Sequence, residues 1–136
     1  MSLFDQLIRH EGLRERPYRD TVGKLTIGVG RNLDDVGIAR EEALILLAND
    51  VLRADAALRR ALPWVETLDQ PRQNVLINMT FNMGIKRLLG FKDTLKAVEE
   101  GRWDDAARGM LASKWASQVG ARATELAEQM RTGIEK

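Results

Sequence analysis

The chain has 136 residues, of which 21 are Lys or Arg and 20 are Asp or Glu, so its formal net charge is only +1. This length suits a single domain that can bury a core without cross-links. Because the sequence has no cysteine and a single histidine, disulfides, thiolate metal sites and the usual kind of zinc centre are excluded. We expect no metal, no cofactor and no nucleic-acid partner.

The first predicted element is a short amphipathic helix over residues 3–11. Ser2 is a suitable N-cap with Asp5 three residues later, and apolar residues then recur at helical spacing. Gly12 is a typical residue to end a helix. Glu11 should therefore lie at the helix C-terminus, where the helix dipole disfavours a carboxylate charge. A carboxyl group that resists ionisation can act as a general acid near neutral pH.

A small β region is predicted over roughly residues 14–34. Asp20 stands just before a turn, where we expect it to be solvated and ionised, and Thr26 lies on the returning strand. Two carboxyl groups in different environments can divide acid and base roles, and a hydroxyl group can hold a water between them. Spacing alone is weak support and by itself favours a simpler reading, in which Glu11 is a surface residue at a helix end and Asp20 a turn former.

The remainder of the chain is predicted to be helical. Apolar residues recur at 3.6-residue spacing from about residue 40 to 62, and Pro63 ends this long helix. Asp69 is a suitable N-cap for a further helix that has Pro71 in its first turn. Three shorter helices follow, at about 91–100, 103–112 and 121–132.

The two tryptophans near these last helices, Trp103 and Trp115, have two readings. They could stack on sugars, but their spacing to other apolar residues favours a place in the core. The methionine-rich stripe of the preceding helix is likewise typical of a core.

Several motifs occur together in this chain. The first group is Glu11-Gly12-Leu13-Arg14, Tyr18-Arg19-Asp20-Thr21 and Thr26-Ile27-Gly28-Val29-Gly30. The second is Ile77-Asn78-Met79-Thr80-Phe81-Asn82-Met83-Gly84, Gly90-Phe91, Arg102-Trp103-Asp104-Asp105-Ala106-Ala107 and Arg131-Thr132-Gly133. In this order, and over nearly the whole chain, the motifs resemble the phage-type lysozyme family typified by the T-even phage enzyme.

The resemblance implies an α+β fold that is mostly helical. A small β-hairpin lobe (about 12–38) and a helical lobe (about 62–136, plus the helix 3–11) would flank a substrate cleft. The connecting helix (about 40–62) would join them, so that residues 1–136 form one lysozyme-like domain.

The resemblance also implies a muramidase, a glycoside hydrolase that acts as an endolysin and lyses the bacterial cell. It would hydrolyse the β-1,4 bond between N-acetylmuramic acid and N-acetylglucosamine in peptidoglycan. Glu11 matches the general acid, Asp20 the second carboxylate and Thr26 the hydroxyl group near the attacking water. The reaction would invert the anomeric centre, which requires the two carboxyl groups to stand about 6.5–9.5 Å apart.

Further site residues follow from the same resemblance. Arg122 matches a position whose guanidinium pairs with the acid. Phe81, Asn82 and Thr94 fall at or beside positions that line the saccharide cleft, and Asn32 is expected to contact the saccharide as well.

The chain departs from the family pattern in three places. Arg31 stands where many relatives have a histidine, and we predict that it forms an ion pair with Asp50, which would not titrate near neutrality. Gly109 replaces a polar side chain that contacts the saccharide, so one subsite should be weaker. The region from Asn32 to Ile38 is short, which trims the lobe that overhangs the cleft.

Two other functions remain open. A lytic transglycosylase would cleave the same bond without water and leave an anhydro sugar, whereas Thr26 favours the hydrolase. A non-catalytic peptidoglycan-binding or phage structural module would not need both carboxylates and the hydroxyl group.

The cellular setting is predicted from what the sequence lacks. No apolar run approaches the length that spans a bilayer, and the N-terminus has neither the basic nor the apolar region of a secretory leader. We expect synthesis in the host cytoplasm without membrane insertion, and action on peptidoglycan glycan strands after release, as a monomer. The resemblance implies that a phage holin provides the release.

Overall fold

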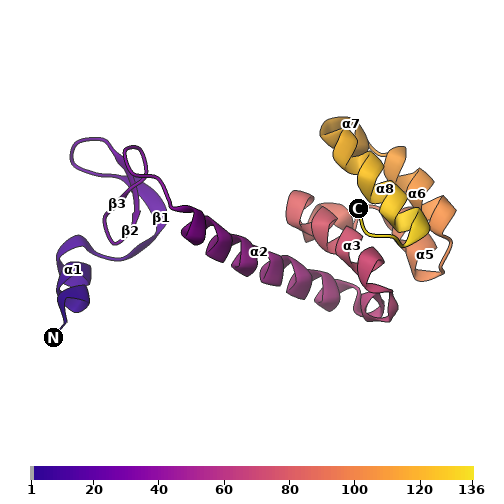
Figure 1. Cartoon of the computed structure of the whole chain (residues 1–136), viewed down its shortest axis with the longest axis horizontal. Coiled ribbons are helices and arrows are strands. Elements are labelled where there is room, and N and C mark those ends of the chain that lie inside the picture. The colour runs from indigo at the N-terminus through magenta and orange to yellow at the C-terminus, as the bar shows by residue number, and fades with distance from the viewer. Residues whose placement is uncertain (1) are drawn as a thin grey trace. The chain divides into compact units, whose positions relative to one another are not determined.

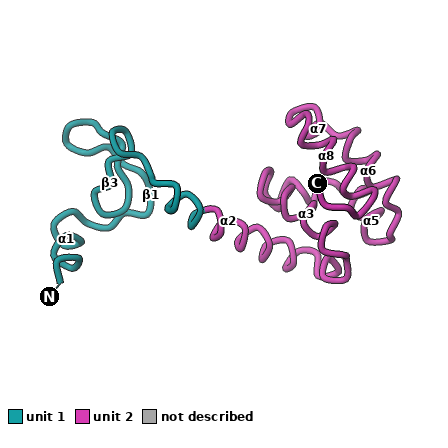
Figure 2. Tube along the Cα trace, in the orientation of Figure 1, with its two compact units in different colours: residues 1–46 teal, residues 47–136 magenta. Residues whose placement is uncertain are grey.

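The computed structural model describes residues 2–136, which are arranged in two compact units. We call residues 1–46 the N-terminal unit and residues 47–136 the C-terminal unit (Figure 2). The described chain consists mainly of α-helices and contains a single three-stranded antiparallel sheet (Figure 1). The predicted α+β, mostly helical fold class is confirmed.

The N-terminal unit contains one complete helix, the sheet and the start of the long helix. Its elements are α1 (Leu3–Glu11), β1 (Arg14–Arg19), β2 (Leu25–Gly28), β3 (Arg31–Asn32) and the first residues of α2 (Arg40–Ala61). The order of strands in the sheet is β1-β2-β3.

Helix α1 begins and ends where the sequence predicts. The Ser2 hydroxyl oxygen accepts a hydrogen bond from the backbone N–H of Asp5 at 3.1 Å, and the Asp5 carboxylate accepts from the Ser2 N–H in return. This reciprocal pair is a capping box, which satisfies N–H groups that the helix itself leaves unbonded. At the other end, Gly12 has φ +78° and its N–H donates to the Ile8 carbonyl.

The sheet places Thr26 opposite a residue of each neighbouring strand. Tyr18 of β1 and Asn32 of β3 are its partners across the antiparallel pairs. The register of β1 shifts between Arg14 and Tyr18, where Pro17 lacks the N–H that a regular ladder would use. Thr26 is the only buried residue among the described residues of this unit.

The C-terminal unit is entirely helical in the residues that the structure describes. After α2 come η1 (Pro63–Thr67), α3 (Gln70–Met83), α4 (Ile85–Leu88), α5 (Lys92–Glu99), α6 (Trp103–Leu111), α7 (Lys114–Val119) and α8 (Ala121–Thr132). The predicted N-cap of α3 is confirmed, because the Asp69 carboxylate accepts from the Arg72 N–H. Helices η1, α4 and α7 were not predicted from the sequence, because they are too short to show helical periodicity.

The core of the C-terminal unit forms where α6 packs on α5 and α8 (Figure 1). Leu58 of α2 joins this core, whereas Leu47 and Val51 on the same helix are exposed. Trp115 is only 6% exposed and belongs to the core, as its spacing predicts. The other nearly inaccessible side chains are Val65, Val75, Leu76, Met79, Leu88, Val98, Met110 and Met130.

None of the helices among residues 2–136 combines the length and the apolar character that crossing a membrane requires.

Candidate functional site

Glu11 lies at the last position of α1 and its side chain reaches the backbone of Gly30. A Cβ atom built on Gly30 would stand only 3.0 Å from Glu11 Oε2. Gly30 has φ +72°, a conformation that residues with side chains rarely adopt, and it forms the tight connection between β2 and β3. The predicted acid is therefore an exposed carboxyl group that lies against the backbone of a glycine.

Asp20 closes the turn between β1 and β2 with its own side chain. Its Oδ1 atom accepts hydrogen bonds from the backbone N–H groups of Val22, at 3.0 Å, and Lys24, at 2.8 Å. The Asp20 N–H donates to the Lys24 carbonyl at 2.9 Å, and Gly23, with φ +86°, completes the turn. Asp20 is therefore a turn former, and the same bonds fix the direction of its carboxylate.

Thr26 is hydrogen-bonded to Lys24, the residue whose N–H donates to Asp20. Its hydroxyl group donates to the Lys24 carbonyl oxygen at 2.8 Å, and the residue is 3% exposed. The Lys24 backbone thus donates to Asp20 through its N–H and accepts from Thr26 through its carbonyl. Because the hydroxyl proton is already engaged, Thr26 Oγ1 is left with its acceptor capacity, so a water could bind to it only by donating a hydrogen bond.

Arg31 has a different partner from the one that the sequence predicts. Its two terminal nitrogens each donate to one carboxylate oxygen of Glu42 at 2.8 Å, and Nη1 also donates to the Gly37 carbonyl. Asp50 instead pairs with Arg53, one turn further along α2. The predicted Arg31–Asp50 ion pair is wrong, because the short 33–38 connection places the start of α2 against Arg31.

The Arg31–Glu42 pair shifts the titration of both groups. The hydrogen bonds from Arg31, together with one from the Ala39 N–H and the positive charge of Arg31, lower the pKa of Glu42 from 4.5 to about 2, although desolvation acts in the opposite direction. The same hydrogen bonds and the negative charge of Glu42 raise the pKa of Arg31. The pair therefore stays charged over the physiological range, and Glu42 also accepts a hydrogen bond from the N–H of Ala39, the residue before α2.

Asn32 makes a local bond at each end of its amide. Its Oδ1 accepts from the Asp35 N–H at 2.9 Å, while its Nδ2 donates to the Asp35 carboxylate at 3.0 Å. Asn32 thus closes the turn that follows β3. Its predicted contact with a saccharide stays a prediction.

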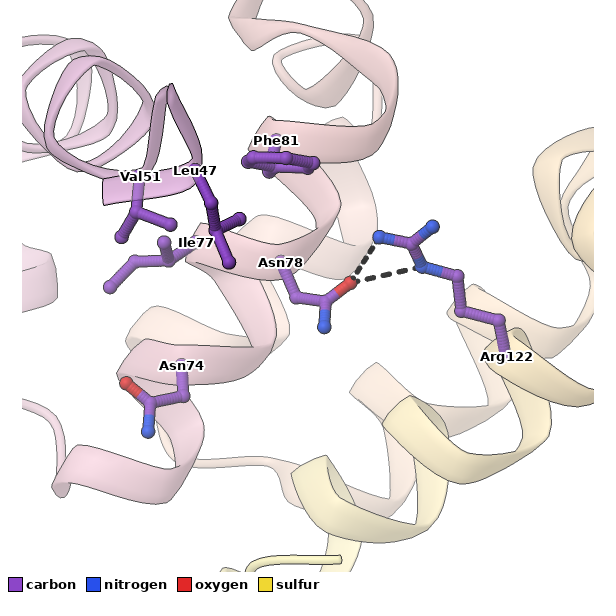
Figure 3. A pocket seen from close by; sticks show the side chains of 7 residues that line it. All are labelled: Leu47, Val51, Asn74, Ile77, Asn78, Phe81 and Arg122. Atoms are coloured by element: carbon purple, nitrogen blue, oxygen red, sulfur yellow. Dashed lines mark hydrogen bonds between the residues drawn. The ribbon is translucent and has the colours of Figure 1, made fainter. Parts of the chain in front are cut away.

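The C-terminal unit contains a hollow of about 360 Å³ near Arg122 (Figure 3). Arg122 Nε and Nη2 both donate to Asn78 Oδ1, at 3.0 and 2.7 Å. Phe81, 43% exposed, lies over another part of the hollow. The remaining lining residues are Leu47, Val51, Asn74 and Ile77. The expected pairing of Arg122 with the acid stays a prediction.

Two other predicted saccharide contacts lie against the core. Asn82 Oδ1 accepts a hydrogen bond of 2.7 Å from the indole Nε1 of Trp115, whose ring packs edge-on against Phe91. Thr94 is 8% exposed and its hydroxyl oxygen faces Gly109 so closely that a Cβ there would stand 2.3 Å away. The glycine at 109 is therefore required for α5 and α6 to approach each other at this point.

Sequence similarity shows the family of this chain. The profile of the family described as Phage lysozyme matches residues 8–131, which is most of the sequence. The chain belongs to the phage lysozyme family. The resemblance that its motifs carry is thereby confirmed.

Curated relatives of this lysozyme-family chain come from two kinds of source. The "Probable T4-type lysozyme 1" of Dictyostelium discoideum is 30% identical, over 97% of this chain and 95% of that protein. The "Probable T4-type lysozyme 2" of the same organism is 27% identical, over 99% and 96%. The "Pre-baseplate central spike protein Gp5" of Enterobacteria phage T4 is 28% identical, over 98% of this chain but only 28% of that protein.

Three features of the site were not predicted from the sequence of this lysozyme-family chain. They are the bonds of the Lys24 backbone, the contact of Glu11 with Gly30 and the Asn78–Arg122 pair. Gly30 could have been found from its place in a Gly-x-Gly run, but nothing in the sequence marks Asn78. Among residues 2–136, no group of three or more His, Cys, Asp and Glu side chains could hold a metal ion.

Proposed function

We propose that this protein is an endolysin-type muramidase that hydrolyses the β-1,4 bond between N-acetylmuramic acid and N-acetylglucosamine with inversion. The observation that carries the proposal is the pairing of Asp20 and Thr26 through one backbone residue, Lys24, in a chain of the phage lysozyme family. A carboxylate and a hydroxyl group held on one short turn suit the placing of a single water.

Glu11 acts as general acid in this proposal. It donates its proton to the glycosidic oxygen as the bond to the anomeric carbon breaks. Asp20 takes a proton from the attacking water or stabilises the positive charge that develops on the sugar. Thr26 Oγ1 accepts a hydrogen bond from that water. This bond orients the water so that one of its lone pairs points toward the anomeric carbon. Asp20 ends the step protonated if it acts as base; if it only stabilises charge, the proton of the attacking water passes to solvent. In both cases Glu11 ends the step ionised.

The other predicted residues are proposed to bind or support. Phe81, Asn82, Thr94 and Asn32 contribute saccharide contacts, of which Phe81 offers an exposed ring face for stacking on a sugar. Arg122 supports Glu11 through its guanidinium. In the structure its Nε and Nη2 both donate to Asn78 Oδ1.

We further propose that the partners are the glycan strands of the bacterial wall and that the protein acts as a monomer. It would be made in the host cytoplasm and would lyse the cell after release.

The products of purified peptidoglycan test the reaction type. A muramidase leaves reducing N-acetylmuramic acid ends, whereas a lytic transglycosylase leaves anhydro ends that are lighter by one water. Mass spectrometry of the soluble fragments should show the hydrolysed form. The anomer formed first, followed by NMR before mutarotation, should be the inverted one, and anhydro products would refute the hydrolase.

A non-catalytic structural module is the second candidate, and one observation favours it. The chain matches a segment of a phage central spike protein at 28% identity. In that case the wild-type protein would bind purified peptidoglycan in a pull-down but release no soluble fragments from it.

A further inference from the structure

We propose that Gly30 is a positioning residue for the acid: the side chain it lacks leaves the space in which the Glu11 carboxyl group lies. This inference rests on the proposed function, because it concerns the placement of the proposed general acid. It assigns to a residue without a side chain a role in the reaction, separate from its role in the turn between β2 and β3.

The atoms nearest to a side chain at Gly30 belong to Glu11. A Cβ atom at position 30 would meet Glu11 Oε2 at 3.0 Å, Cδ at 3.3 Å and Cγ at 3.4 Å, and these are its three nearest neighbours. Carbon atoms in ordinary contact stand about 3.5–4.0 Å apart. A methyl group at position 30 would therefore displace the far end of Glu11 by a few tenths of an ångström.

Gly28 provides a control for the backbone. It has φ +68°, close to the +72° of Gly30, and lies two residues earlier on the same hairpin. A Cβ built on Gly28 meets nothing within 4 Å. Alanine at either position should thus cause a similar backbone strain, but only alanine at position 30 touches the acid.

The displaced group is the end of a flexible side chain, so the contact should disturb catalysis rather than folding. Glu11 is exposed at the end of α1 and can yield by rotating its side chain. A general acid must, however, lie within hydrogen-bond reach of the leaving oxygen, and small errors in such geometry reduce rates strongly. A side chain at position 30 should therefore lower kcat.

The test compares Gly30→Ala with Gly28→Ala in Tm, kcat and KM on purified peptidoglycan. We expect the two variants to lose Tm to the same extent and to keep the wild-type KM. The kcat of Gly30→Ala should fall about tenfold below that of Gly28→Ala. Equal kcat values in the two variants would overturn the inference. If either alanine variant fails to fold, Gly30→Asn and Gly28→Asn replace the pair, because asparagine tolerates positive φ better.

A double variant shows whether the effect passes through Glu11. In the Glu11→Gln background, adding Gly30→Ala should lower the residual activity no further than adding Gly28→Ala. A further loss specific to Gly30→Ala would contradict a role exerted through the acid. If Glu11→Gln alone keeps full activity, the proposed function loses its general acid. If Glu11→Gln loses most of its activity but the two glycine variants behave alike, only the inference about Gly30 fails.

Discussion

At the scale of single residues, Lys24 connects the two groups that are proposed to handle the water. Its N–H donates to Asp20 and its carbonyl accepts from Thr26, so the backbone rather than side-chain packing sets both directions. The identity of the side chain at position 24 is unimportant to these two bonds. What the arrangement requires is the turn itself, which Gly23 permits with φ +86°.

Replacing Asp20 by asparagine separates its structural role in the turn from its proposed role in the reaction. The amide oxygen of Asp20→Asn still accepts from the N–H groups of Val22 and Lys24, so the turn and Tm should be retained. The amide cannot take a proton from water, so kcat on peptidoglycan should fall by about 10²–10⁴-fold. Asp104→Asn, at an exposed carboxylate in the first turn of α6, serves as control and should keep its activity. Full activity in Asp20→Asn would remove Asp20 from the reaction.

The Arg31–Glu42 pair should make stability depend on pH in a defined window. The pKa of Glu42 is lowered in the folded chain to about 2 from an ordinary 4.5, so its contribution is complete above pH 4.5 and is lost as pH falls toward 2. The Tm difference between the wild type and Glu42→Gln should therefore be largest near neutrality and shrink in this acidic range. Glu41→Gln, at the exposed neighbouring residue, is the control. A difference that grows on acidification would contradict the pairing.

At the scale of elements, helix α2 buries only two of its residues, Ala54 and Leu58. Leu58 is fully buried in the C-terminal core, whereas Leu52 on the same helix is 66% exposed. Leu58→Ala should lower the free energy of unfolding by about 2–5 kcal/mol, because it removes contacts and leaves a cavity. Leu52→Ala should change it by less than about 0.5 kcal/mol. Chemical denaturation followed by circular dichroism measures both changes in the free energy of unfolding. Equal losses would contradict the burial of Leu58 and the exposure of Leu52.

Elements defined by local chemistry could be predicted from the sequence, and those defined by distant contacts could not. Ser2, Gly12 and Asp69 act within a few residues of their own positions, so the limits of α1 and the start of α3 follow from them. The partner of Arg31 depends on how a short connection folds back, and periodicity says nothing about that. The contact between Glu11 and Gly30 likewise exists only once α1 and the hairpin are folded.

At the scale of the whole molecule, burial is unequal between the two units. Thr26 is the only buried residue in the described part of the N-terminal unit, whereas the apolar core lies in the C-terminal unit. Native-state hydrogen exchange should therefore show the slowest amides in α3, α6 and α8, since protection follows buried apolar contacts. Amides of α1 and of the sheet should exchange by openings of lower free energy. Equal protection in both units would contradict this distribution.

In the proposed mechanism, the activity as a whole depends on Glu11. Clearing of purified peptidoglycan should be measured with the wild type, Glu11→Gln and Glu15→Gln, the last changing an exposed glutamate of β1. The wild type and Glu15→Gln should clear the suspension at similar rates. Glu11→Gln should have an unchanged circular dichroism spectrum and Tm but should clear the suspension about 10²–10⁴-fold more slowly, because an amide has no acidic proton to give to the leaving oxygen. Clearing by Glu11→Gln at the wild-type rate would contradict the proposed acid and with it the mechanism.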